Sequence, residues 1–306
     1  SIADGIGFQT ILGLLSDATP PASPRTENAV LPAPERWRQL AETRFAAEAE
    51  LRVEQSARRK RALAALEPFQ DKRATTPRLE LSGPTSDRRR YATISIALAR
   101  IKALCAKFDA TVNDIFLALA STALRNYLTE IGDLPETPLV VNSARSYRRD
   151  EHGDFGNRIV ALHPHLATHI AEPRERLRAI QASMASEMQR TDHDEALLDA
   201  AEKPFGARDR RAVFAERMAS GKRLLPGNVT LSNVPGPSGE RSYAGFRQRH
   251  NFPVPIIGSG RFLNITSRRS GDNLDMGVMA DAEKIVDVDR IATLFAAALD
   301  EMEILR

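Results

Sequence analysis

The segment at residues 113–129 constrains the fold of this chain more than any other part of the sequence. Its first half, residues 115–124, is apolar on nearly every side of a helix and is interrupted only by Ser121 and Thr122. A helix with apolar side chains all round must be enclosed by other elements, and this run is far shorter than the ~18–20 residues of a membrane-spanning helix. The segment therefore predicts a layered globular fold around a buried helix.

Segments with the pattern of a strand and segments with the spacing of a helix follow one another irregularly along the chain. Residues 90–96 alternate Tyr, Thr and Ser with Ala and Ile, which is typical of a half-buried strand. Further strands are expected at residues 139–141, 158–162, 228–234, 261–266 and 274–279, the last two joined by a turn at 270–272. Helices are expected up to Lys107, at 113–129, from Pro173 onward, at 190–223 and at the C-terminus, where Asp287 or Asp289 caps a periodic apolar stripe. This order predicts an α/β sandwich with a mixed sheet.

The first part of the chain differs in character from the rest. Prolines at positions 20, 21, 24, 32 and 34 predict an extended linker over residues 17–35, because proline removes backbone donors and disfavours helix in the residue before it. Residues 36–66 are rich in Ala, Glu and Arg and contain no Gly or Pro, which predicts one or two half-exposed helices. We therefore divide the chain into residues 1–80, with the linker and the basic helices, and a domain at 81–306.

Positive charge is concentrated near this division. Residues 36–90 contain 14 Lys and Arg against 8 Asp and Glu, whereas the net charge of the whole chain is only +3. Such a segment fits a phosphate-bearing partner such as acyl-CoA, an anionic lipid or a nucleic acid, or simply a solvated helix face with Glu–Arg pairs. The cluster at residues 58–61 has no aromatic neighbour on which a base could stack, so we expect no nucleic acid partner.

Cysteine and histidine usage argues against a metal site. The single cysteine, Cys105, excludes an internal disulfide and reads as a small buried hydrophobe rather than a reactive thiol. His163, His165 and His169 lie close together, but Pro164 breaks helical spacing, and a loop location explains them better than zinc. We expect no metal and no cofactor.

Other generic signals are also missing. The sequence has no phosphate-loop motif and no Gly-x-Ser-x-Gly nucleophile elbow, and residues 258–260 precede a strand instead of following one, unlike a dinucleotide loop. No apolar run reaches membrane-spanning length and no signal peptide opens the chain. We expect a cytoplasmic protein with at most peripheral contact to the inner membrane or to lipid inclusions.

A set of ordered phrases is similar to one family, the wax ester synthase/diacylglycerol acyltransferases. Ser1-Ile-Ala-Asp4-Gly5 resembles the end of the His-His-x-x-x-Asp-Gly motif of that family, with the two histidines falling just before Ser1. The other phrases are Asn113-Asp114 before an apolar helix, Ser146-x-Arg148, Gly156-Asn157, Asn233-Val-Pro235-Gly236-Pro237, Leu263-Asn264-Ile-Thr266, Gly271 and Asp281. The six of these blocks that have two or more residues stand in the family's order, followed by Gly271 and Asp281, which makes the resemblance specific over essentially the whole chain.

The resemblance implies the fold of CoA-dependent acyltransferases, in which two chloramphenicol-acetyltransferase-like domains face each other across a tunnel. Residues 1–80 would be the end of the first domain and 81–306 the complete second domain. Acyl-CoA would be the co-substrate, and the acceptor a long-chain alcohol or diacylglycerol. The second motif histidine would act as general base on the acceptor hydroxyl, so this chain alone is expected to be inactive and to need the missing N-terminal segment of the same protein.

The resemblance also implies roles for individual residues. Asp4 would pair with an arginine and fix the histidine loop, with Arg148 as the candidate, and Gly5 would allow close backbone approach. Asn113 and Asp114 would be needed for activity, but Thr111 or Asn113 could equally cap the helix, with Asp114 favoured in its first turn; the two roles are compatible.

The remaining phrases imply structural or pocket roles, and one position departs from the family's pattern. Asn233 and the turn at residues 235–237 would end a strand, whereas Ser146, Arg148, Gly156 and Asn157 would shape the substrate pocket or have a structural role. Ala144 stands where the family usually has proline, so the loop expected at residues 142–149 can differ in shape.

Two further functions stay open at this point. One is a condensation-domain-like transferase that uses a carrier-protein thioester; the Asn-Asp and Asn-Val-Pro-Gly-Pro phrases favour the acyl-CoA enzyme instead. The other is a non-catalytic fragment that binds lipid or complements a separate N-terminal piece. Ester formation from free acyl-CoA separates all three.

Overall fold

The computed structural model describes most of the chain from residue 76 onward. The described residues are 12, 16–17, 34–36, 38–39, 42–43, 76–149, 159–199, 227–236, 239, 241–258 and 260–305. Asp4, Gly5, Gly156, Asn157 and Pro237 lie outside them, as do most of the expected linker and basic helices.

Six strands form one mixed sheet. They are β1 (Arg89–Ala97), β2 (Val141–Ser146), β3 (Ile159–Leu162), β4 (Val229–Val234), β7 (Leu263–Ser270) and β8 (Asn273–Asp281), in the spatial order β1-β8-β7-β4-β2-β3. β7, β4 and β2 are parallel, whereas β1 with β8, β8 with β7, and β2 with β3 are antiparallel. The predicted α/β fold with a mixed sheet is therefore confirmed. A separate two-stranded hairpin consists of β5 (Ser242–Tyr243) and β6 (Phe246–Arg247).

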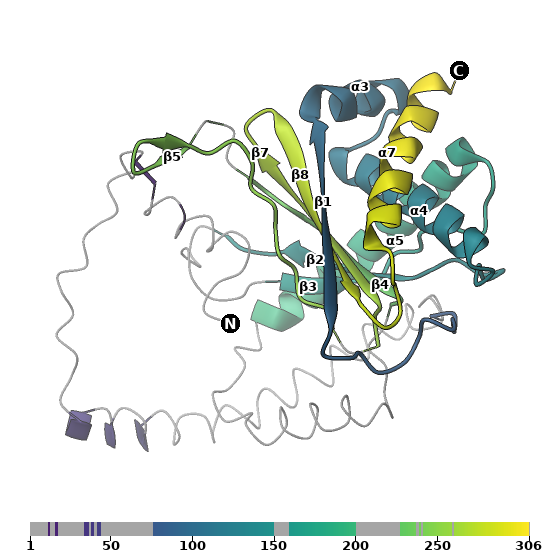
Figure 1. The fold of residues 1–306 in the computed structure, drawn as a ribbon. Helices are drawn as coiled ribbons and strands as arrows, with labels where there is room; N and C mark the ends of the chain where they lie inside the picture. The colour runs from purple at the N-terminus through teal and green to yellow at the C-terminus, as the bar shows by residue number, and fades with distance from the viewer. Residues whose placement is uncertain are drawn as a thin grey trace.

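Four helices lie together on one side of the sheet, as Figure 1 shows: α3 (Leu98–Phe108), α4 (Val112–Glu130), α5 (Pro173–Asp199) and α7 (Val288–Ile304). The predicted helix at 113–129 is α4, and every residue from 115 to 124 is buried. The C-terminal helix is confirmed too, with its apolar stripe buried and Asp287 as its cap, since the carboxylate accepts the Arg290 N–H at 3.0 Å.

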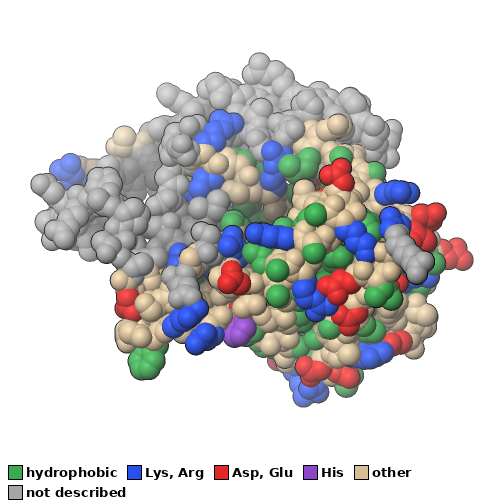
Figure 2. All heavy atoms as spheres, turned by 90° about the horizontal axis from the view of Figure 1, so that it is seen from above, with side chains coloured by type: hydrophobic (Ala, Val, Ile, Leu, Met, Phe, Trp, Pro, Cys, Tyr) green, Lys and Arg blue, Asp and Glu red, His purple; other side chains and the backbone are tan. Residues whose placement is uncertain are grey.

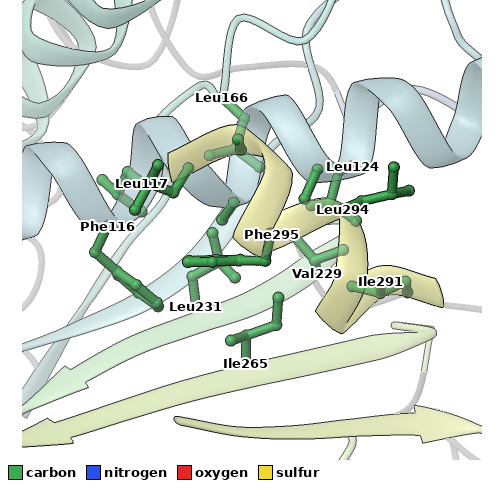
Figure 3. Packing of buried hydrophobic residues seen from close by; sticks show 14 of the residues in the cluster. Phe116, Leu117, Leu124, Leu166, Val229, Leu231, Ile265, Ile291, Leu294 and Phe295 are labelled. Atoms are coloured by element: carbon green, nitrogen blue, oxygen red, sulfur yellow. The ribbon is translucent and has the colours of Figure 1, made fainter. Parts of the chain in front are cut away.

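The core forms where α4 and α7 pack on the sheet. Phe116 of α4 and Phe295 of α7 place their ring centroids 6.2 Å apart, and Val229, Leu231 and Ile265 reach them from β4 and β7, as Figure 3 shows. Burying one such side chain stabilises the fold by about 1.5–3 kcal/mol. Interlocked apolar packing therefore holds the helical layer on this face of the sheet.

The sequence-based boundaries fail around β2. Residues 139–141 were expected as a strand and 142–149 as a loop, but β2 runs from Val141 to Ser146. Residues 139–141 are all buried, but their burial does not indicate where the strand begins or ends. Val140 lies before β2 and forms an isolated bridge with His165. Asn142 pairs with Thr230 of β4, and residues 143–146 pair with β3, so pairing with other strands extends β2 beyond its apolar start. The helix expected from residue 190 is the continuation of α5, described as far as Asp199.

β8 is buried on both of its faces. Leu274, Met276, Val278 and Ala280 point to the helical core, and the residues between them form part of the opposite face. By strand alternation and register that opposite face, here called the polar face, contains Tyr91, Thr93, Ser95, Asn142, Thr230, Ser232, Val234, Asn264, Thr266, Arg268, Asp275, Gly277, Met279 and Asp281. Its chemistry differs from the apolar face because it carries hydroxyl, amide and charged groups.

Gly277 allows a loop to lie directly against the polar face. A Cβ atom at this position would overlap the carbonyl group of Pro253 and would come within 3.1 Å of the Tyr91 ring. Backbone atoms cannot swing aside as a flexible side chain can, so only glycine fits here.

We predict that Gly277→Ala lowers the free energy of unfolding by about 2–3 kcal/mol, because the added methyl group forces the Pro253 backbone away from the sheet. Chemical denaturation measures this value. Gly239→Ala is the matched control, since a Cβ there meets no atom within 4 Å. Equal stability of the two variants would contradict the close packing of residue 253 on β8.

Candidate functional site

Asp275 organises the polar face at the end of the sheet near the β7–β8 turn. Its carboxylate is fully buried and accepts a hydrogen bond from the Ser95 hydroxyl at 2.6 Å and from the Asn251 N–H at 2.7 Å. The Nδ1 atom of His250 lies 3.1 Å from the same carboxylate. A buried carboxylate requires such partners, so Asp275 fixes the chain at residues 250–251.

The rest of this loop, here called the crossing segment (residues 250–256), is pinned at two further points. The Tyr91 hydroxyl donates to the Pro253 carbonyl at 2.9 Å, and the Asn264 side-chain amide donates to the Ile256 carbonyl at 2.7 Å. Asn264 therefore has a defined role in the Leu-Asn-Ile-Thr phrase. It holds a loop across the polar face.

The carboxyl ends of β2, β4 and β7 lie at one end of the sheet, because the three strands are parallel. Ser146 ends β2, and its hydroxyl oxygen accepts the Arg148 N–H at 3.3 Å. Asn233 near the end of β4 accepts from the Ser267 hydroxyl at 3.0 Å. Open α/β sheets commonly bind ligands at such an end. The topology thus brings two of the predicted phrases to the same end of the sheet.

Position 236 requires glycine for the same reason as position 277, which is that the backbone of another segment lies directly against it. A Cβ at position 236 would overlap the carbonyl group of Arg269 on the neighbouring strand β7. Asn233 bonds to β7 as well, and Pro235 follows the end of β4 in an exposed position. These contacts fit the expected architectural role of residues 233–236.

Asn113 and Asp114 begin α4 on the helical side of the sheet. Thr111 is the cap: its hydroxyl oxygen accepts the Asp114 N–H at 3.1 Å, while the Asp114 carboxylate accepts the Thr111 N–H at 3.0 Å and hydroxyl at 2.8 Å. This capping box confirms the structural explanation of Asp114 through Thr111, not through Asn113. A further role of either residue in activity stays a prediction.

Asp281 ties the end of β8 to the start of β1. It accepts from the Ser86 N–H at 2.8 Å, the Ser86 hydroxyl at 2.6 Å and the Glu283 N–H at 3.1 Å. Burial alone would raise the pKa of this carboxyl, but these hydrogen bonds outweigh it, so the pKa lies below its ordinary value. Asp281 is therefore held as a carboxylate in the folded protein.

Two of the expected loop histidines are held by hydrogen bonds from their backbone N–H groups to side chains of α5. The His163 N–H donates to the Glu187 carboxylate at 2.6 Å and the His165 N–H to the Ser183 hydroxyl at 2.8 Å, and burial lowers the pKa of His165. In the part of the chain that the structure describes, no group of three His, Cys, Asp or Glu side chains could hold a metal ion. Among the same residues, no helix is both long and apolar enough to cross a membrane.

Sequence reasoning missed a basic cleft of about 430 Å³ between the β5–β6 hairpin and the β7–β8 turn. Arg241, Arg247, Arg249 and His250 line it. Figure 2 looks onto this end of the molecule, where Lys and Arg side chains are frequent, and acidic side chains are more frequent toward the helices. The arginines are dispersed over nine residues, whereas the sequence draws attention to the denser run at residues 36–90.

Among solved structures, the fold is similar to that of condensation domains and of a bacterial acyltransferase. The starter condensation domain of rhizomide synthetase matches 99% of this chain and 63% of its own chain, with a TM-score of 0.55 and 16% identity, which shows the fold alone. The wax ester synthase/diacylglycerol acyltransferase from Marinobacter aquaeolei VT8 is 28% identical, with a TM-score of 0.59, over 80% of this chain and 55% of that one.

Family models and sequence relatives agree with this likeness. The wax ester synthase/diacylglycerol acyltransferase catalytic domain matches residues 1–116, and the WS/DGAT C-terminal domain matches residues 155–303. Two Mycobacterium tuberculosis (strain H37Rv) proteins, provisionally named diacylglycerol O-acyltransferases, are 30% and 32% identical over 233 and 240 residues. Each match covers 74% of this chain but only 46% and 50% of the relative.

The chain belongs to the wax ester synthase/diacylglycerol acyltransferase family, because two models of that family match it in order and together cover most of its length. It spans about half the length of the curated relatives that it matches.

We predict that Thr111→Ala and Asp114→Ala each lower the free energy of unfolding by about 1 kcal/mol and that their effects are not additive, because both remove the same capping box. A double-mutant cycle from urea denaturation measures the coupling. The control cycle combines Asp114→Ala with Thr129→Ala, which lies at the other end of α4. The effects of these two substitutions should be additive. Additivity in the first cycle would contradict the shared cap.

Acid should remove the contribution of Asp281 to stability. Since the folded-state pKa is below the ordinary value of 3.8, the contribution is complete above about pH 4 and disappears as the pH falls through the folded-state pKa. Wild type should therefore be more stable than Asp281→Asn at pH 6, with the difference shrinking toward pH 3. Denaturation midpoints across this range measure it, with the exposed Asp87→Asn as the control. A difference that stayed constant with pH would contradict the carboxylate role.

Proposed function

We propose that this chain is the acyltransferase part of an enzyme that transfers a long-chain acyl group from acyl-CoA to a fatty alcohol or diacylglycerol. The observation that carries the proposal is the ordered match of the catalytic and C-terminal family models at residues 1–116 and 155–303. The products would be wax esters or triacylglycerols.

The chemistry would be a direct attack of the acceptor hydroxyl on the thioester carbonyl. A histidine of the family motif, in the positions just before Ser1, would take the hydroxyl proton as the new C–O bond forms. The tetrahedral intermediate would then expel the CoA thiolate, which recovers the proton as a thiol. General-base help of this kind contributes about 10²–10⁴-fold, and the thiolate leaves readily enough that no covalent enzyme intermediate is needed.

The residues of this chain would position that reaction. Asp4 would pair with Arg148 and hold the histidine loop, and Gly5 would give the loop room. Ser146, Arg148, Gly156 and Asn157 would shape the substrate pocket. The described backbone of residues 146–148 supports this assignment, because it lies at the end of the sheet where the three parallel strands end.

The division of the chain near residue 80 belongs to the same proposal. One sheet joins strands from Arg89 to Asp281, which supports treating residues 81–306 as one unit. The remaining partner would be the segment that carries the histidines. A lipid surface, of the inner membrane or of lipid inclusions, would present the acceptor.

A condensation-domain-like transferase is the alternative that the test must separate, because an enzyme of that kind would share this fold. The two enzymes differ in their donor, which is free acyl-CoA in one and a carrier-protein thioester in the other. The donor is therefore what the assay must vary.

We predict that the 306-residue chain forms no ester from palmitoyl-CoA with hexadecanol or dioleoylglycerol. The same chain extended by the residues encoded before Ser1 should form it, because only the extension would supply the general base. Radiolabelled acyl-CoA with thin-layer separation measures both. Replacing the second motif histidine by alanine should lower kcat about 10²–10⁴-fold, whereas Arg178→Gln, an exposed position on α5, should leave it unchanged.

Three results would contradict the proposal. These are ester formation by the 306-residue chain alone, the absence of a histidine pair before Ser1, and transfer by the extended chain from an acyl-carrier-protein thioester but not from acyl-CoA.

A further inference from the structure

The basic cleft lies at the end of the sheet where β7 turns into β8. Arg241 and Arg247 come from the base of the β5–β6 hairpin, and Arg249 and His250 follow it. Asp272 in the β7–β8 turn is the acidic residue among the described lining residues. The cleft therefore combines three guanidinium groups and an imidazole with a single carboxylate, a composition that favours an anionic ligand.

The hairpin that supplies two of these arginines is fixed in place. Its strands pair Ser242 with Arg247, and the Gln248 N–H donates to the Arg241 carbonyl at 2.8 Å, which holds the base of the hairpin closed. Arg241 and Arg247 thus leave neighbouring points of one closed backbone ladder. Their spacing is set by the hairpin and not by a free loop.

Asp17 holds the tip of the same hairpin. The carboxylate of Asp17 accepts the N–H groups of Ala244 and Gly245, each at 2.9 Å, and its own N–H donates to the Ser242 carbonyl at 2.9 Å. Both turn residues have positive φ, 49° and 80°, so their N–H groups converge on one acceptor. These hydrogen bonds, chiefly the one from Gly245, lower the pKa of Asp17, so the anchor is a carboxylate at neutral pH.

The other side of the cleft is held by the sheet. Asp275 fixes His250 and the Asn251 N–H, and the His250 ring stacks on Phe252 with centroids 5.2 Å apart. The cationic groups are therefore carried on a backbone held at both ends, as a preorganised binding site requires.

Positive charges are also crowded at this place. Arg268, a buried residue on the polar face next to the end of β4, has a lowered pKa because of burial and because of the positive charge of Arg241. Like charges at close range destabilise one another unless an anion lies between or beside them. A phosphate offers three acceptor oxygens and about two negative charges, and arginine binds it in a bidentate manner.

We propose that the cleft formed by Arg241, Arg247, Arg249 and His250 binds the phosphate groups of a substrate, namely those of the 3′-phosphorylated adenosine diphosphate end of the acyl donor. The choice of donor rests on the proposed function, whereas the phosphate chemistry rests on the cleft itself. The same chemistry could be supplied by an anionic lipid headgroup, and the experiment separates the two sources.

The test uses the 306-residue chain and does not depend on turnover. Isothermal titration with coenzyme A, adenosine 3′,5′-bisphosphate and dephospho-CoA measures binding to wild type and to Arg241→Gln/Arg249→Gln. Arg178→Gln/Arg290→Gln is the matched control, because it removes two exposed arginines outside the cleft, one from α5 and one from the first turn of α7. Flotation with phosphatidylglycerol and phosphatidylcholine vesicles provides the lipid arm, and thermal melting checks that each variant folds.

The expected result is saturable binding of coenzyme A and adenosine 3′,5′-bisphosphate to wild type and to the control. The dissociation constants should rise at least tenfold in the cleft variant, and dephospho-CoA should bind more weakly than coenzyme A. If instead only phosphatidylglycerol vesicles bind, and the cleft variant loses that binding, the phosphate site is supported with a lipid as its source.

Equal binding of all ligands by wild type and the folded cleft variant would overturn the proposal, as would wild type that binds neither nucleotides nor anionic vesicles. Such a failure is distinguishable from failure of the proposed function. Ester formation by the N-terminally extended chain would still be measured independently of where the phosphates bind.

Discussion

The burial of β8 on both faces is the constraint on which the rest of the structure depends. A strand covered on one side by helices can leave its other side to water, but β8 carries Asp275 and Asp281 on that other side and buries both. Each carboxylate then needs donors, and they come from distant segments: Ser95 and Asn251 for Asp275, and Ser86 for Asp281. Gly277 between them lets a backbone lie against the sheet. The position of the crossing segment follows from Asp275 and Gly277 together with Tyr91 and Asn264, and the basic cleft begins where that segment begins.

The same requirement operates inside the helical layer. Ser121 and Thr122 interrupt the apolar run of α4, yet both are buried and satisfied, Ser121 by donating to the Leu166 carbonyl and Thr122 by accepting from Arg176 at 2.7 Å. Arg176 itself is buried and also donates to the carbonyls of Ile170 and Ala171. A buried cation without these acceptors would be strongly destabilising. The two polar residues of α4 therefore determine how the start of α5 and the loop before it pack on the helix.

The spacing of apolar residues predicted those helices and strands that have one face against the core and the other exposed. The alternation at residues 90–96 gave β1, and the stripe through Ile291 and Phe295 gave α7, because in each case one face contacts the core. It failed at β2, where Asn142 is held by pairing with β4 and the largely polar residues 143–146 by pairing with β3. The family phrases located Asn233 and Gly236, but no local pattern indicates that residue 277 must leave room for residue 253. Nor does the sequence bring Asp17 to the β5–β6 turn, since that contact spans more than two hundred residues.

The described residues of the family phrases share one kind of role, which is to fix backbone. Asp114 closes a helix cap, Asn264 holds the crossing segment, and Gly236 admits a neighbouring strand. None of these three contacts supplies a proton acceptor of the strength that an alcohol needs, and a histidine loop held by Asp4 would supply it from the other part of the protein. The proposed function thus implies a division of labour, in which the sheet would fix positions and the histidine would do the chemistry. The parallel ends of β2, β4 and β7 give this division a location. Residues 146–148, residues 233–236 and the basic cleft all lie at that end of the sheet, so a donor with its phosphates in the cleft would lie beside the strand ends proposed to shape the substrate pocket.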